Sequence, residues 1–227
     1  MQRASNALTG LLPQNLKSLA NRYYLHVIKL VKSTAYHIYF YKLTHKQFDG
    51  LHLGSGDAKI ENFCNIDASL YSLCDIVARV ETLKLSSDSV GIIYNSHVFE
   101  HIPMAHAKRV LAEWYRVLRL GGRLYICVPD LEVLFKVYLD NLPFYETEKG
   151  KYLVDRACFL TYGAQRNKYD FHFYGYSFIT LKDMLESVGF KDVKRFDRSK
   201  LDIVPFNDSS SVKVDDFLMS LNVEATK

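Results

Sequence analysis

The chain of 227 residues is 48% hydrophobic and 24% charged, which is typical of a globular protein with one sizeable α/β domain and an appendage, or with two small domains. Its net charge of +4 arises in residues 1–47, which contain seven Lys or Arg and no acid, and the slightly acidic remainder argues against a nucleic-acid-binding core. No uncharged apolar run is long enough for a transmembrane helix, and four cysteines without CxxC spacing indicate neither a zinc site nor a disulfide framework. We therefore expect a cytoplasmic protein from a reducing compartment.

The N-terminal segment, residues 1–47, predicts a basic aromatic helical extension ahead of a domain at 48–227. Residues 22–43 contain no Gly or Pro, and their apolar residues recur at mixed three- and four-residue spacing. The simpler interpretation is a helix packed across the domain's own face. The alternative is peripheral contact with an anionic membrane, or dimerisation, because tyrosines alternate with lysines and histidines.

From residue 49 onward, strand-like and helix-like runs alternate, which predicts βαβ units and a mostly parallel sheet. The expected strands are residues 50–53, 63–67, 75–80, 91–96, 123–128 and 193–196, with a last one within 219–225. A helix is expected from 103 to about 118, followed by a turn at Gly121-Gly122. A second, TLKDMLESVGF, is expected to be capped by Thr180 and ended by Gly189.

The region between these two helices is less regular. Residues 144–151 predict a loop, 152–162 a helix, and 163–176 an aromatic loop. Long loops inside compact domains are often binding loops, and a flap that excludes solvent is the alternative. The fold class predicted for the whole is α/β: a Rossmann-like three-layer sandwich with a seven-stranded, mostly parallel sheet.

The stretch LHLGSGDAKIENFCNID places Gly54 and Gly56 directly after a strand and Asp67 at the end of the next one. Glycines allow a backbone to approach a ligand closely, and a carboxylate at this position can accept both hydroxyls of a ribose. The few residues between Gly56 and the second strand leave barely one helical turn, which is poor for a pyrophosphate. The loop suits a cofactor with a ribose and no phosphate, although a plain turn explains a glycine pair equally well.

Further motifs follow in order: YNSHVFEHIP, AEWYRVLRLGGRLYICVPDLEVL, YDFHFYGYSF and the terminal SLNVEATK. Together with the glycine loop, this set resembles the class I S-adenosylmethionine-dependent methyltransferases over about residues 49–227. It is most similar to the type 11-like members associated with surface-polysaccharide biosynthesis. Four departures from that pattern are His52, Ala58, Arg79 and Leu120; Arg79 stands where the family tends to have an acid near the adenine.

The resemblance implies S-adenosylmethionine as the cofactor and a set of residues around it. The methionyl end would lie against the Gly54–Gly56 backbone, the ribose would bind Asp67, and the adenine would lie near Val80. Asn95 and Ser96 would face the methionine moiety and the reacting centre. The cofactor-binding residues implied are therefore Gly54, Ser55, Gly56, Asp67, Val80, Asn95 and Ser96.

The stretch from His97 to His101 reads H-x-x-E-H, an inverted zinc-protease signature. A metal site of this kind needs both histidines on one face of a helix. This stretch instead follows a strand and precedes Pro103, so it is expected to be a strand-to-helix junction, and we expect no metal. A sugar hydroxyl needs a base, and histidine is the commonest one. His97 is the candidate for contact with substrate, His101 is either a second base or a structural partner of Glu100, and His172 is the third candidate.

Three further residues are candidates for substrate contact. Tyr174 and Tyr176 in the aromatic loop could stack on a sugar ring, or pack within a lid. Asp130 follows the fifth strand at the catalytic edge, and could instead cap the next helix.

These features predict O- or N-methylation of a small or carbohydrate acceptor, with no nucleic-acid partner; the link to surface glycans rests on the resemblance alone. A catalytically inactive methyltransferase-fold subunit, acting as a scaffold or interaction partner, is the alternative suggested by the departures. A nicotinamide-linked oxidoreductase conflicts with the short segment after Gly56.

Overall fold

The computed structural model describes residues 48–69, 72–167, 169–204 and 208–227. The predicted helical extension at 1–47 lies outside these residues. None of the helices in the described part of the chain is both long and apolar enough to cross a bilayer.

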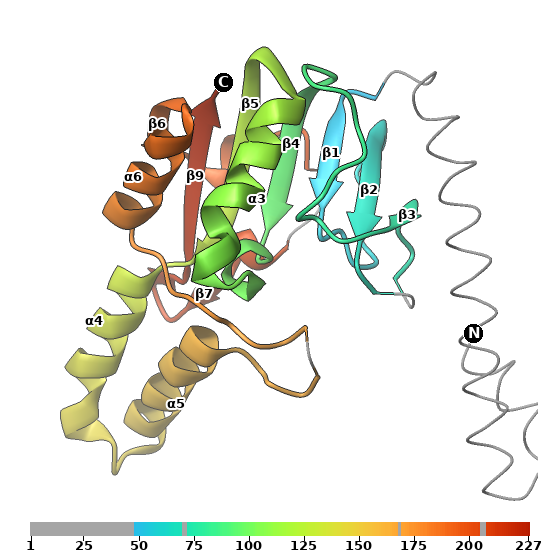
Figure 1. Ribbon diagram of the computed structural model, residues 1–227. Coiled ribbons are helices and arrows are strands. Elements are labelled where there is room, and N and C mark those ends of the chain that lie inside the picture. The colour runs from blue at the N-terminus through green and yellow to red at the C-terminus, as the bar shows by residue number, and fades with distance from the viewer. Residues whose placement is uncertain (1–47, 70–71, 168, 205–207) are drawn as a thin grey trace, which may run out of the picture.

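A central sheet of seven strands runs in the order β3-β2-β1-β4-β5-β9-β6 (Figure 1). Neighbouring strands from β3 to β5 pair in parallel, and β9 runs antiparallel to both β5 and β6. This confirms the predicted seven-stranded, mostly parallel sheet. The strands are β1 (Gly50–Leu53), β2 (Phe63–Asp67), β3 (Ile76–Val77), β4 (Val90–Ser96), β5 (Leu118–Pro129), β6 (Lys191–Arg195) and β9 (Ser220–Thr226).

Helices and a small hairpin complete the described structure. The α-helices are α3 (Met104–Val117), α4 (Leu131–Asn141), α5 (Glu148–Tyr162) and α6 (Phe178–Val188). The 3₁₀ helices are η1 (Phe99–His101), η2 (Leu142–Phe144), η3 (Arg198–Lys200) and η4 (Ser209–Ser211), and the hairpin pairs β7 (Lys213–Val214) with β8 (Phe217–Leu218).

The main core lies between the sheet and the two helices α3 and α6. In α3 the residues Ala107, Val110, Leu111, Trp114 and Val117 recur at helical spacing and are all buried. A second core, around Tyr94 and Tyr125, includes Ile60 and Val204, which belong to irregular segments.

A third cluster joins α4, α5 and the β7–β8 hairpin through Leu134, Leu153 and Val214. In Figure 1 the arrowheads of β1, β2 and β4 point toward the edge on which α4 and α5 lie. These helices and the aromatic loop therefore sit beside the carboxyl ends of the parallel strands.

Several predicted boundaries were wrong, for local reasons. Helix α6 begins earlier than expected, because Ser177 rather than Thr180 is its N-cap and the two side chains form a capping box. Helix α5 begins at Glu148 behind Thr147, whose hydroxyl accepts from the Gly150 amide, so much of the expected loop at 144–151 is helical.

Two strands also differ from their predicted bounds. Strand β5 already pairs at Leu118, before the double glycine, and a register shift follows as Val90 pairs with Leu118 but Ile92 with Arg123. The double glycine therefore lies within an irregular part of β5 rather than in a turn before it, and Gly121 has a φ of 73°. Strand β3 covers only two of the residues expected at 75–80.

Candidate active site

The candidate site lies where β1 and β4 are neighbours. The chain continues from β1 to β2 and β3 on one side of β1, while β4 and β5 lie on its other side. Ligands of open α/β sheets bind at such a switch point, outside the carboxyl ends of the strands. The glycine loop follows β1, and Asn95 and Ser96 end β4, so the fold places these groups at one edge.

Two glycines shape the loop after β1 in different ways. Gly54 has a φ of 73°, and a Cβ there would lie 1.9 Å from Cγ2 of Val98, so the loop packs tightly against the start of η1. Gly56 has a φ of 53°, and no described atom lies within 4 Å of the position its Cβ would take. Both positions favour glycine, and the second leaves open space directly above the backbone.

Asp67 ties the end of β2 to this loop. One carboxylate oxygen accepts from the Gly56 amide at 2.8 Å, and the other accepts from the Ser69 amide at 2.6 Å. Each carboxylate oxygen has a second lone pair, so Asp67 retains capacity for further donors such as ribose hydroxyls.

Buried polar atoms at this edge lack partners. The Asn95 side-chain amide donates to the Leu53 carbonyl at 3.2 Å, which links β4 to β1, while Oδ1 of the same side chain has no hydrogen-bond partner among the described residues. Within the same described ranges, the buried Ser55 Oγ is also unpartnered. Such atoms are rarely left unpaired in native proteins, and they fit a ligand that carries its own polar groups, as a methionyl moiety does.

Val80 lies beyond the short β3 and is buried. Its carbonyl accepts from Nε1 of Trp114 at 2.8 Å, which fixes this segment against α3. Arg79 stands where the family pattern has an acid, and its positive charge is neutralised because its guanidinium pairs with the carboxylate of Glu81. An acid is therefore present two residues after Arg79.

Three histidines surround a buried glutamate after β4. His97 has a φ of 53°, an uncommon conformation for a non-glycine residue, and its amide donates to the Cys127 carbonyl. Its Nδ1 lies 3.3 Å from Oε1 of Glu100, and its Nε2 lies 3.1 Å from Oγ of Ser220 on β9. The sequence suggested His101 as the partner of Glu100, whereas His97 makes the closer contact.

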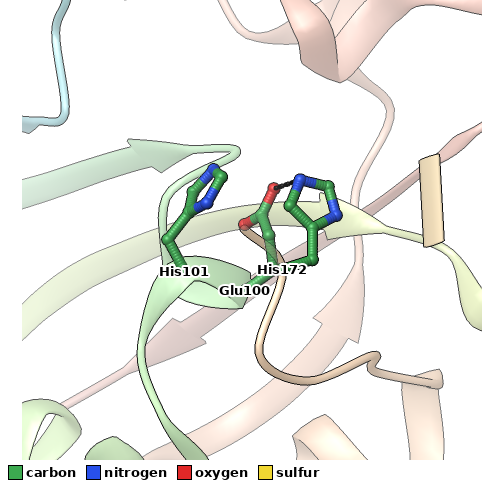
Figure 2. Close-up of side chains that lie close together, drawn as sticks. All are labelled: Glu100, His101 and His172. Atoms are coloured by element: carbon green, nitrogen blue, oxygen red, sulfur yellow. Dashed lines mark ion pairs between the residues drawn. The ribbon is translucent and has the colours of Figure 1, made fainter. Parts of the chain in front are cut away.

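The aromatic loop supplies the third histidine. The amides of Phe173 and Tyr174 both donate to the Glu100 carbonyl, at 2.8 and 3.4 Å, which anchors the loop on η1. Nε2 of His172 lies 4.0 Å from Oε1 of Glu100. The rings of His101 and His172 meet edge to face, with centroids 4.8 Å apart (Figure 2).

The electrostatics of this cluster favour an ionised glutamate beside a neutral histidine. Burial raises the pKa of Glu100, but the attraction of the neighbouring imidazoles, chiefly that of His97, outweighs it, so the pKa lies below its ordinary value. Burial lowers the pKa of His172 despite the attraction of Glu100. A neutral imidazole can accept a proton, which is what general-base chemistry requires.

The candidate substrate residues occupy different environments. Tyr176 is completely buried and packs on Phe99 with ring centroids 5.0 Å apart, whereas Tyr174 is partly exposed. Asp130 is buried, caps α4 by accepting from the Glu132 amide, and pairs with Arg195 at 2.8 Å. Asp130 therefore performs the capping role that the sequence suggested as the alternative.

Comparisons with known proteins agree with this arrangement. Residues 57–126 match a family described as a methyltransferase domain, and no curated protein matches the chain. The strand order is that of a Rossmann-like α/β fold, and the domain match over residues 57–126 supports an enzyme that uses S-adenosylmethionine to methylate its substrate.

Several solved structures are distantly similar. An S-adenosylmethionine-dependent methyltransferase from Archaeoglobus fulgidus is 18% identical with a TM-score of 0.48, over 88% of this chain and 94% of that chain. One from Mesorhizobium loti is 17% identical with a TM-score of 0.48, over 80% and 91%. A protein from Thermotoga maritima, described as a possible histamine N-methyltransferase, is 15% identical with a TM-score of 0.48, over 80% and 83%. The strand order, rather than these likenesses, carries the assignment of the fold.

Glu100 is the residue whose importance sequence reasoning underestimated. The sequence indicates it as the acid of the H-x-x-E-H pattern or as a partner of His101, whereas in the structure it is 1% exposed and lies at the centre of the histidine cluster. Its position between His97 and His101 could be seen in the sequence. The contact with His172, which comes from a distant loop, could not be predicted from the sequence.

Proposed function

We propose that this protein transfers the methyl group of S-adenosylmethionine to an oxygen or nitrogen of a small or carbohydrate acceptor. The cofactor supplies an electrophilic methyl group on a sulfonium, and the chain's own residues hold and orient it. The observation that carries the proposal is the open space over Gly56, beside a carboxylate, at the switch point of the sheet.

Each part of the cofactor has a proposed partner. Asp67 binds the ribose hydroxyls with its remaining lone pairs, and the segment at Val80 flanks the adenine. The unpartnered oxygens of Asn95 and Ser55 receive donors from the methionyl end, with Ser96 beside them. This assignment is supported by the need of buried polar atoms for partners.

The acceptor is proposed to bind on the opposite side of the methyl group, between η1 and the aromatic loop. His97, His101 and His172 surround Glu100 just after the end of β4, and a neutral imidazole among them can take up a proton. The partly exposed Tyr174 offers an aromatic surface for a sugar ring. The buried Tyr176 packs against Tyr174, and Asp130 pairs with Tyr176 through the backbone. A role in surface-glycan synthesis rests on the sequence resemblance, and residues 48–227 are proposed to form the catalytic domain.

The test is calorimetric titration of the full-length protein with S-adenosylhomocysteine, repeated with Asp67→Ala. We expect micromolar binding in the wild type that the substitution weakens at least about tenfold, roughly 1.4 kcal/mol. The matched control is Asp88→Ala, because Asp88 is exposed and precedes β4 at the opposite edge of the sheet. Absence of binding in folded wild-type protein would overturn the proposal and support the inactive-scaffold alternative.

A further inference from the structure

Glu100, His101 and His172 bring metal-ligating groups together from two segments far apart in the sequence. Each side chain offers one ligand atom, and the three atoms lie within 4.8 Å of one another. Figure 2 shows the three side chains close together, with a dashed line for the ion pair between Glu100 and His172. Among the described residues, neither oxygen of this buried carboxylate has a hydrogen-bond partner.

The hydrogen bonds of both rings determine their tautomers. Nδ1 of His101 lies 2.9 Å from the Phe171 carbonyl, and Nδ1 of His172 lies 2.9 Å from the Leu160 carbonyl. A carbonyl oxygen only accepts, so each Nδ1 must carry the hydrogen and each neutral ring must present a lone pair at Nε2. Metal-bound histidines are commonly oriented in this way, with the other ring nitrogen donating to a backbone carbonyl.

The Nε2 lone pair of His172 therefore faces the buried Glu100 carboxylate, with Oε1 at 4.0 Å. Two groups that only accept do not stabilise each other. His97, whose Nδ1 lies 3.3 Å from Oε1, leaves Oε2 of this buried carboxylate without a donor among the described residues, and such an atom is costly. A cation placed between the three groups satisfies all of them.

We propose that Glu100, His101 and His172 bind a divalent transition-metal ion, with zinc as the best match. Two imidazoles and one carboxylate form a ligand set found in catalytic zinc sites, and such sites keep an open coordination position. His97 would be a positioning residue, because its Nδ1 lies 3.3 Å from Glu100. These three ligands differ from those of the H-x-x-E-H pattern, in which His97 would be a ligand and His172 would not. The proposal also differs from the expectation, drawn from the sequence, that the protein binds no metal.

The geometry requires a modest contraction on binding. Zinc bonds of about 2.0–2.1 Å in a tetrahedron place ligand atoms about 3.4 Å apart, compared with at most 4.8 Å here. Rotation of the His101 side chain, which is not fully buried, provides this adjustment. With the Nε2 lone pairs of His101 and His172 on the metal, His97 would be the histidine left to take up a proton. The open position would receive an oxygen of the acceptor, and these last assignments rest on the proposed function.

The test uses full-length protein that has been stripped with a chelator and then titrated with zinc chloride, with metal content measured after dialysis. We expect one zinc per chain in the wild type and at least tenfold weaker binding in His101→Asn and His172→Asn. Asparagine can retain the hydrogen bond to the carbonyl while removing the Nε2 ligand. His106→Asn is the matched control, because His106 lies on the exposed face of α3 and should leave binding unchanged.

Titration of the same variants with S-adenosylhomocysteine separates this inference from the proposed function. Wild-type protein that binds the nucleoside but retains no zinc, or zinc binding that survives in His172→Asn, would overturn the metal site. Zinc binding lost in both histidine variants while nucleoside binding is unchanged would support it. Zinc bound without any nucleoside binding would support the metal site and count only against the proposed function.

Discussion

The Asp67 carboxylate accepts a hydrogen bond from the Gly56 amide at 2.8 Å. The bond joins the end of β2 to the loop after β1. It therefore links Asp67, the proposed ribose ligand, to the Gly54–Gly56 backbone, against which the methionyl end is proposed to lie. A change at either residue should therefore affect cofactor binding through both.

The two loop glycines should respond differently to substitution by alanine. Gly56→Ala should lower the free energy of unfolding by only about 1–2 kcal/mol, the typical strain of a left-handed residue, because its Cβ meets no described atom. It should nevertheless weaken S-adenosylhomocysteine binding at least tenfold, because the methyl group would enter the proposed cofactor space. Calorimetric titration measures this affinity, and an unchanged value would show that the cofactor does not occupy the space over Gly56.

Gly54→Ala should be the more destabilising of the pair. Its Cβ would overlap Cγ2 of Val98 at 1.9 Å in addition to the strain at a φ of 73°, and a β-branched neighbour has little rotamer freedom. We expect a further loss of about 1–3 kcal/mol from overpacking, measured by urea unfolding beside Gly56→Ala. Equal stability of the two variants would contradict this packing.

Asp130→Ala should destabilise the protein by about 1–2 kcal/mol, because it removes the N-cap of α4 and the partner of Arg195. The control is Glu132→Ala, whose exposed carboxylate lies 3.4 Å from the same guanidinium and should change stability by less than about 0.5 kcal/mol. Thermal unfolding followed by circular dichroism compares them. If the two variants lost equal stability, the cap would not be the source of the effect.

Trp114→Phe should cost about 1–3 kcal/mol, because the buried Val80 carbonyl would lose its donor at 2.8 Å. Tyr115→Phe is a suitable control, since it changes one hydroxyl on the adjacent, partly exposed residue of α3. Trp114 is the single tryptophan, so unfolding must be followed by circular dichroism rather than by fluorescence. A loss no larger than that of the control would show that the indole bond is dispensable.

Acidification should reduce stability through His52. Burial lowers the pKa of this side chain below its ordinary value of 6.5, although Asn65 and nearby acids oppose the shift. The unfolded chain therefore binds a proton that the folded protein does not. The contribution is complete above about pH 6.5 and diminishes as the pH falls toward the folded pKa, by at most about 1.4 kcal/mol per pH unit.

Urea unfolding at pH 7.5 and 5.5 measures this dependence. His52→Gln should show a smaller loss between the two pH values than the wild type, while His172, whose pKa is also lowered, accounts for part of what remains. An identical loss in both proteins would mean that His52 is protonated equally in the folded and unfolded states.

The sequence alone was enough to predict the central sheet and α3, the helix that packs on it. Alternating apolar runs predicted the strands, and three- and four-residue spacing predicted α3, because these patterns reflect backbone periodicity within a few turns. The glycine loop and Asp67 could be located for the same reason: a strand followed by two glycines and a second strand ending in an acid is a local pattern.

Only the tertiary structure decided the surroundings of Glu100. His172 reaches it through a loop anchored by backbone bonds to the Glu100 carbonyl, and Ser220 on β9 contacts His97. The register shift in β5 likewise depends on how this strand pairs with β4. Local periodicity specifies which face of an element is buried, whereas the partners of a buried polar group follow from how distant segments pack, and no short window of sequence contains that information.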